Sequence, residues 1–84
     1  MKEYFITFRS ITMAQRGQSV LKSGGIPAFL SRTPRWMEEK GCGYSLRLPP
    51  GHEGAAVERL REGGIPFSKL YLRREGGDIE ELKP

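Results

Sequence analysis

The fold of this chain is indicated by a segment that occurs twice, as Leu21-Lys22-Ser23-Gly24-Gly25-Ile26-Pro27 and again as Leu60-Arg61-Glu62-Gly63-Gly64-Ile65-Pro66. In each copy the glycine pair predicts the end of a helix, because glycine accepts the left-handed backbone of a C-cap. A strand-like pattern ahead of each copy recurs as well, since Tyr4, Ile6 and Phe8 return as Tyr44, Leu46 and Leu48. The chain is therefore predicted to consist of two βαβ halves.

Two such halves in one small domain give the element order βαββαβ. This order predicts an α+β ferredoxin-like sandwich, in which a four-stranded antiparallel sheet carries two helices on one face. Pro27, near the start of the second strand, favours an edge position for that strand. Strands are expected at residues 4–8, 26–30, 43–48 and 67–72, and helices from Ser10 or Thr12 to Gly24 and from about His52 to Glu62.

With 84 residues, the chain has room for one small domain. We expect it to span residues 1–74, with halves at about 3–32 and 43–73. Residues 1–74 hold thirteen Lys and Arg against six Asp and Glu, whereas residues 75–84 hold four acids against Lys83, which predicts an acidic, flexible C-terminal tail. The basic body could attract nucleic acid or an acidic protein, although scattered Lys and Arg also make an ordinary solvated surface.

Composition excludes several classes of protein. One cysteine and one histidine allow no intramolecular disulfide and no multi-cysteine metal site. A lone cysteine fits a reducing compartment such as the cytoplasm, and neither a signal peptide nor an apolar run of membrane-spanning length is evident. We therefore expect a cytoplasmic protein without metal, cofactor or membrane association. We also expect no enzymatic activity, because no catalytic base, metal site or phosphate-binding loop is evident.

The cysteine lies in Gly41-Cys42-Gly43, where neither neighbour has a side chain to shield the thiol. In the expected topology the first two strands run one way and the last two run back, so the third strand starts beside the turn that opens the first helix. A helix N-terminus favours an anion, and so would stabilise a thiolate. The alternative is that Cys42 packs inward as a small hydrophobe. The residues expected around Cys42 are Arg9, Ser10, Thr12, Gly41 and Gly43.

His52 is expected to begin the second helix rather than to activate Cys42. The third strand would separate the two residues by roughly 20 Å, which is too far for a nucleophile and its base. Arg35, Trp36 and Met37 precede Cys42 in a predicted loop. Large apolar side chains on a loop either dock a partner or fold back over the end of the sheet, and both alternatives stay open.

Several short motifs stand in a characteristic order: Ile6-Thr7-Phe8-Arg9-Ser10, Gly25-Ile26-Pro27, Pro34-Arg35, Cys42-Gly43 and Gly64-Ile65. In this order and spacing they resemble the putative selenium/sulfur carrier protein-like domain family over about residues 3–72. The resemblance implies that Cys42 carries sulfur or selenium as a persulfide or perselenide. It also implies protein partners such as a cysteine desulfurase or proteins of selenium metabolism.

Two other functions remain as alternatives. Lys40-Gly41-Cys42-Gly43-Tyr44 matches the third-strand pattern of RNA-recognition motifs at four of five positions, with Cys42 at a base-stacking position. Ser45 and Arg47 then stand where that pattern has apolar or aromatic residues. A regulatory or adaptor domain that only binds proteins, with an incidental cysteine, is equally compatible with the fold.

Overall fold

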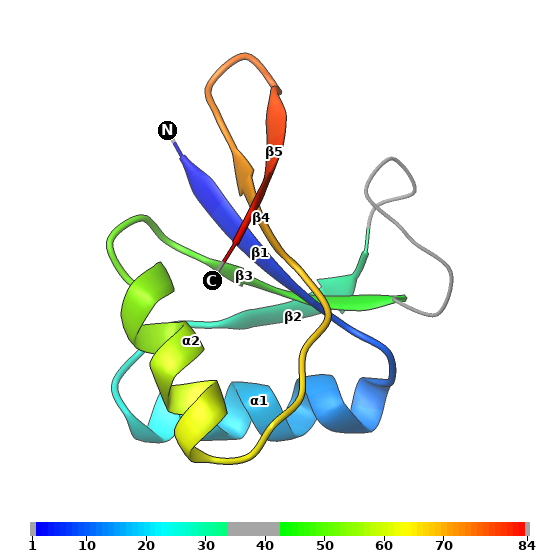
Figure 1. Cartoon of the computed structure of the whole chain (residues 1–84), viewed down its shortest axis with the longest axis vertical. Helices are drawn as coiled ribbons and strands as arrows, with labels where there is room; N and C mark the ends of the chain where they lie inside the picture. The colour runs from blue at the N-terminus through cyan, green and yellow to red at the C-terminus, as the bar shows by residue number, and fades with distance from the viewer. Residues whose placement is uncertain (1, 34–42, 84) are drawn as a thin grey trace.

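The computed structural model describes residues 2–33 and 43–83, and in these a sheet packs against two helices (Figure 1). The predicted α+β class is confirmed, and within these ranges neither helix is long and apolar enough to cross a membrane. The elements in chain order are β1 (Glu3–Phe8), α1 (Ile11–Ser23), β2 (Phe29–Arg32), β3 (Tyr44–Leu48), α2 (Glu53–Glu62), β4 (Leu70–Arg73) and β5 (Ile79–Leu82).

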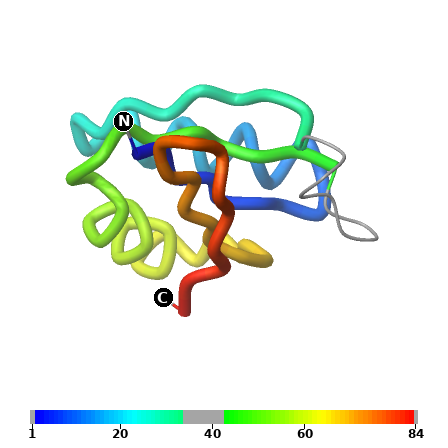
Figure 2. The backbone as a smooth tube through the Cα atoms, turned by 90° about the horizontal axis from the view of Figure 1, so that it is seen from above, coloured from blue at the N-terminus to red at the C-terminus, as the bar shows by residue number. Residues whose placement is uncertain are grey.

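The strands of the described residues form one five-stranded sheet in the order β2-β3-β1-β4-β5, and each neighbouring pair is antiparallel. The central strand is β1, whose Ile6 is in register with Leu46 of β3 on one side and Leu70 of β4 on the other. Figure 2 shows β2 and the C-terminal segment at opposite sides of the sheet. The edge position expected for the second strand is thus confirmed.

The expectation of four strands is wrong, because the acidic segment predicted to be a flexible tail supplies β5. Gly76 and Gly77, both with φ of +93°, turn the chain after β4. The backbone of Arg74 closes this turn with two hydrogen bonds. Its N–H donates to the Asp78 carbonyl at 2.8 Å, and its carbonyl accepts from the Gly77 N–H at 2.9 Å. Leu82 then packs against the core at the end of β5. The strand β5 has only four residues, and its two acids are adjacent, so the sequence shows no alternation of apolar and polar residues from which a strand could be predicted.

Both copies of the repeated segment end their helix in the same way. The Ile26 N–H donates to the Leu21 carbonyl, and the Ile65 N–H donates to the Leu60 carbonyl, each at 2.9 Å. The glycine before each isoleucine is left-handed, with φ of +77° and +67°. This is the hydrogen-bonding pattern of a glycine C-cap, so the helix ends predicted from the glycine pairs are confirmed.

Two strands begin later than expected, and for the second strand the reason is that the chain first completes the helix cap. The second strand begins at Phe29 rather than at Ile26, whose N–H bonds to Leu21 in the cap of α1 and whose side chain is buried in the core. Pro27 therefore precedes β2 instead of lying within it. The last strand likewise begins at Leu70 rather than at Phe67.

The core lies between the helices and the facing side of the sheet. Gly17 allows close packing there, because a Cβ atom at this position would lie only 3.1 Å from Phe8 Cζ and 3.2 Å from Leu60 Cδ2. Both halves contribute fully buried side chains, which include Ile6, Phe8, Leu21, Leu46, Leu48 and Leu60.

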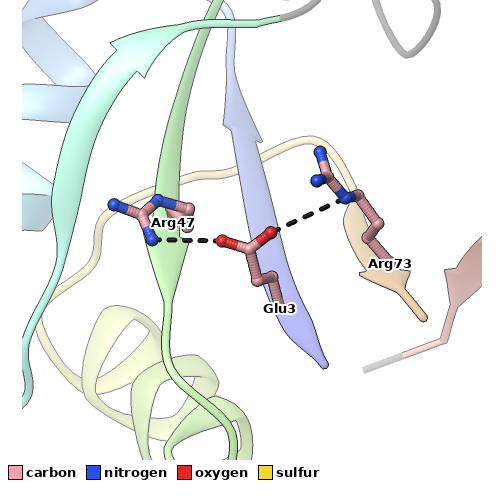
Figure 3. Close-up of polar contacts among 3 residues, drawn as sticks. All are labelled: Glu3, Arg47 and Arg73. Atoms are coloured by element: carbon pink, nitrogen blue, oxygen red, sulfur yellow. Dashed lines mark hydrogen bonds and ion pairs between the residues drawn. The ribbon is translucent and has the colours of Figure 1, made fainter. Parts of the chain in front are cut away.

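The opposite face of the sheet carries ion pairs and a small apolar cluster. Glu3 of β1 lies between two arginines, 3.1 Å from Arg47 of β3 and 3.6 Å from Arg73 of β4 (Figure 3). These contacts connect the central strand to both of its neighbours. The apolar cluster on this face consists of Phe5, Tyr71 and Ile79.

Candidate functional site at the start of β3

The strand register brings the start of β3 to the end of β1. Phe8, the last residue of β1, is in register with Tyr44, the first residue of β3. Arg9 follows Phe8 and Gly43 precedes Tyr44, so both lie at the same end of the sheet, where α1 begins. The predicted proximity between the third strand's start and the first helix's turn is confirmed.

Ser10 is the residue that caps α1. Its backbone is extended, and its Oγ accepts a hydrogen bond from the Met13 N–H at 3.1 Å. Thr12, the other candidate cap, lies inside the helix and is exposed, as is Arg9 before the cap. The first turn holds no acidic side chain, so the positive end of the helix dipole is not neutralised by its own residues.

Gly43 is hydrogen-bonded to the neighbouring strand, and no side chain of the described residues crowds it. Its carbonyl accepts a hydrogen bond from the Thr33 N–H at 3.0 Å, which continues the β2–β3 ladder beyond β2. A Cβ atom built on Gly43 would meet no atom of the described chain within 4 Å. Gly43 is partly exposed, and no described side chain crowds its Cα atom.

Two hydroxyl residues near Gly43 were missed by the sequence analysis. Thr33 and Ser45 are buried, and within residues 2–33 and 43–83 their hydroxyl oxygens have no hydrogen-bond partner. The alternation of side chains along β3 predicts that Ser45 lies on the sheet face away from the helices, whereas Leu46 lies on the helix face. It does not predict that the Ser45 side chain is buried. No short motif identifies such a pair, because their proximity depends on the register of β2 and β3.

Several predicted site residues fall between the described ranges. Gly41, Cys42, Arg35, Trp36 and Met37 belong to residues 34–42, which lie outside the described part of the chain. Of the residues expected around Cys42, the structure therefore places Arg9, Ser10, Thr12 and Gly43.

His52 lies at the other end of β3 from Gly43 and is the N-cap residue of α2, as expected. Its side chain forms no capping hydrogen bond with the described residues. No group of three or more His, Cys, Asp or Glu side chains that could hold a metal ion occurs within residues 2–33 and 43–83.

The RNA-binding alternative requires an aromatic side chain on the open face of the sheet. Tyr44 instead packs against the core on the helix side, with the Arg32 guanidinium 5.9 Å from its ring centroid. An exposed open-face ring is that of Phe29 in the edge strand β2, where the Arg47 guanidinium lies 4.9 Å from its centroid, whereas Phe5 and Tyr71 are buried in their own cluster. Stacking of bases on Phe5 and Tyr71, as in an RNA-recognition motif, would require these two rings to be uncovered.

Comparisons with known proteins identify one family. The family model described as "Putative Se/S carrier protein-like" matches residues 3–72, which include both βαβ halves. The comparisons with curated proteins and with solved structures gave no match. The matched range covers most of the chain, so the protein belongs to the putative Se/S carrier protein-like family.

Proposed function

We propose that this protein carries sulfur or selenium on Cys42 and passes it between partner proteins. The observation that carries the proposal is the family match over residues 3–72. Cys42 is the only cysteine of the chain, and therefore the only side chain that could hold the atom as a persulfide or perselenide.

The surroundings of Gly43 support this role for its neighbour in sequence. Cys42 is bonded to Gly43, which lies at the end of the sheet where Ser10 caps α1. The uncompensated helix N-terminus and the exposed Arg9 provide a positive environment for an anionic thiolate or persulfide. Thr12 and Gly41 complete the set of residues that we propose to surround the anion.

The transfer would be an exchange without an external oxidant. The Cys42 thiolate attacks the outer sulfur of a cysteine persulfide on a donor such as a cysteine desulfurase. The donor's S–S bond breaks, and its electron pair leaves with the donor cysteine as a thiolate. An acceptor nucleophile then attacks the outer atom on Cys42, which leaves as a thiolate. The protein returns unchanged, as a carrier rather than an independent enzyme.

Partner contacts and location are part of the same proposal. Arg35, Trp36 and Met37 precede Cys42 in sequence, and a partner that reaches Cys42 would use them as a docking surface. The donor and acceptor would be desulfurases or proteins of selenium metabolism in the cytoplasm, where thiols are kept reduced.

We also infer a ferredoxin-like unit extended by β5. The chain order βαββαβ and the sheet order β2-β3-β1-β4 support this assignment. In such a unit the strand β5 is an addition to the edge formed by β4.

Intact-mass spectrometry tests the carrier proposal directly. Wild type and Cys42→Ser would be incubated with a cysteine desulfurase and cysteine, and separately with selenocysteine, without reductant. We expect one added sulfur or selenium atom in wild type, removed by dithiothreitol and missing in Cys42→Ser. Failure to load, together with alkylation of Cys42 at the rate of an ordinary thiol, would contradict the proposal. Retained partner binding by Cys42→Ser would then favour the adaptor function.

A further inference from the structure

The buried hydroxyls of Thr33 and Ser45 need an explanation. Ser45 has 0% and Thr33 4% of its surface exposed, and among the described residues neither Thr33 Oγ1 nor Ser45 Oγ has a hydrogen-bond partner. A buried hydroxyl without a partner destabilises the folded state, and native proteins rarely keep one without a reason. Two such groups close together point to a ligand that completes their hydrogen bonds.

The sheet register brings the two residues onto the same face of neighbouring strands. Ser45 of β3 is in register with Ser31 of β2, and two residues further along β2 the Thr33 N–H bonds to the Gly43 carbonyl. Thr33 and Ser45 are therefore diagonal neighbours on the same face of the sheet. Diagonal neighbours lie about 7 Å apart, so one atom between them can accept a hydrogen bond from each hydroxyl.

The gap between the two side chains is left open by Gly43. This residue stands directly across from Thr33 and two residues before Ser45, and it has no side chain. A Cβ atom there would meet no described atom within 4 Å, and Gly43 itself is partly exposed. Gly43 therefore contributes no side chain to the space between the two residues, and its partial exposure places solvent next to the buried hydroxyls.

The chemistry of the position favours a small anion. Each hydroxyl can donate one hydrogen bond, and no cluster of acidic, histidine or cysteine ligands for a cation occurs in the described ranges. The exposed Arg9 lies at the same end of the sheet, and residues 1–74 are basic overall. Thr7 belongs to the same face, but its Oγ1 already accepts a hydrogen bond from the Lys69 N–H at 3.1 Å.

We propose that Thr33 and Ser45 form a donor pair that binds a chalcogen anion beside Gly43. The anion is either free hydrosulfide or hydroselenide, or the outer sulfur or selenium of a persulfide or perselenide. This inference rests on the proposed function, because sulfur or selenium is taken as the anion from the proposed cargo of Cys42. Gly43 is the next residue in the chain. Both hydroxyls donate to the anion without any change in oxidation state.

Two variants remove the donors and keep the shape of the site. Thr33→Val and Ser45→Ala, alone and combined, lose hydroxyls that have no described partner, so their melting temperatures should equal or exceed that of wild type. Ser31→Ala is the matched control, because Ser31 is exposed on the same face and in register with Ser45. A merely structural role for the hydroxyls would instead lower the melting temperature.

The first arm tests the free anion in Cys42→Ser protein. Sodium hydrosulfide is titrated anaerobically, with sodium chloride as the ionic-strength control, while amide NMR shifts are recorded. Saturable shifts at Gly43 and Ser45 that disappear in the double variant support a site for free hydrosulfide.

The second arm tests the protein-bound form, with Cys42 loaded with sulfur and its release to cyanide measured over time. We expect release from the double variant to be about tenfold faster than from wild type, since hydrogen bonds to charged groups are strong. Ser31→Ala should release at the wild-type rate.

The outcomes separate this inference from the carrier proposal. Loading of Cys42 with equal release rates in all variants, and no hydrosulfide shifts, would overturn the donor pair and leave the carrier proposal intact. Hydroxyls that only bind water would give this same result. If Cys42 takes no sulfur at all, the carrier proposal fails, and the hydrosulfide titration still decides whether the site binds the anion.

Discussion

The two halves of the molecule share the way their helices end and differ in the way they begin. Both α1 and α2 finish with a left-handed glycine and a hydrogen bond from the following isoleucine to a buried leucine. At the N-termini, Ser10 caps α1 with its side chain, whereas His52 forms no such bond to the described residues. The first turn of α2 holds Glu53, and that of α1 holds no acid.

This difference indicates which half is suited to an anion. A carboxylate in the first turn partly neutralises the positive end of a helix dipole, and Glu53 also accepts a hydrogen bond from the Gly51 N–H at 2.9 Å. The N-terminus of α1 lacks this compensation and lies beside Gly43. The two halves therefore share the structure of their helix ends and their buried leucines, which we call the common frame. They differ at the helix N-termini, because the positive end of the α1 dipole is not neutralised by an acid and that of α2 is partly neutralised by Glu53.

The largest expected effect tests the common frame. Leu21 and Leu60 are equivalent in the repeat, and both have 0% exposure. We expect Leu21→Ala and Leu60→Ala each to lower the free energy of unfolding by about 2–5 kcal/mol, through lost burial and the cavity left behind. Denaturant unfolding measures both values. A loss at one position that is several-fold smaller than at the other would show that the two halves do not share their core equally.

The next effect tests the helix caps. Gly25→Ala and Gly64→Ala place a Cβ atom on a left-handed backbone, so each should lower the free energy of unfolding by about 1–2 kcal/mol. Gly54→Ala in α2 is the control, because no described atom lies within 4 Å of its new Cβ atom and its φ is not positive. This control should leave stability unchanged or slightly higher. Equal stability of all three variants would contradict the cap assignment.

The sequence predicts those parts of the fold that depend on residues close together in the chain. A glycine pair specifies a helix end through its own backbone, and the alternation of Tyr4, Ile6 and Phe8 specifies that these side chains share one face of the sheet. These features were confirmed. The start of β2 was predicted too early, because Ile26 looks strand-forming by residue type but is used in the cap of α1.

Other features depend on residues far apart in the sequence and could not be predicted from local patterns. The strand β5 forms because its backbone pairs with β4 and because Leu82 and Ile79 pack against the apolar clusters on the two faces of the sheet. Ser45 is buried through the register of three strands, although a serine between Tyr44 and Leu46 suggests an exposed position. The role of Cys42 stays a prediction, since residues 34–42 lie outside the described ranges.

A smaller effect tests the difference between the helix N-termini. Ser10→Ala removes the hydrogen bond to the Met13 N–H, so it should lower the free energy of unfolding by about 1 kcal/mol. His52→Ala removes no capping bond to the described residues and should change it by less than about 0.5 kcal/mol. Thermal and denaturant unfolding of both variants measure this contrast. Equal losses would mean that the two N-termini are energetically alike.

The smallest effect concerns the ion pairs that join strands of the two halves. Glu3 of the first half contacts Arg47 and Arg73 of the second, at 3.1 and 3.6 Å, and all three side chains are partly exposed. Pairs of this kind contribute little each, so Glu3→Gln should lower the free energy of unfolding by at most about 1 kcal/mol.

Glu80→Gln is the matched control, because the structure gives Glu80 a contact with one arginine, Arg74, at the sheet edge. Its loss should therefore be smaller than that of Glu3→Gln. Both differences from wild type should shrink at about 1 M salt, where the screening length falls to about 3 Å. If the effect of Glu3→Gln does not depend on salt, Glu3 stabilises the sheet through packing of its side chain rather than through its charge. Side-chain packing, as in the shared core, would then stabilise the contact between the two halves.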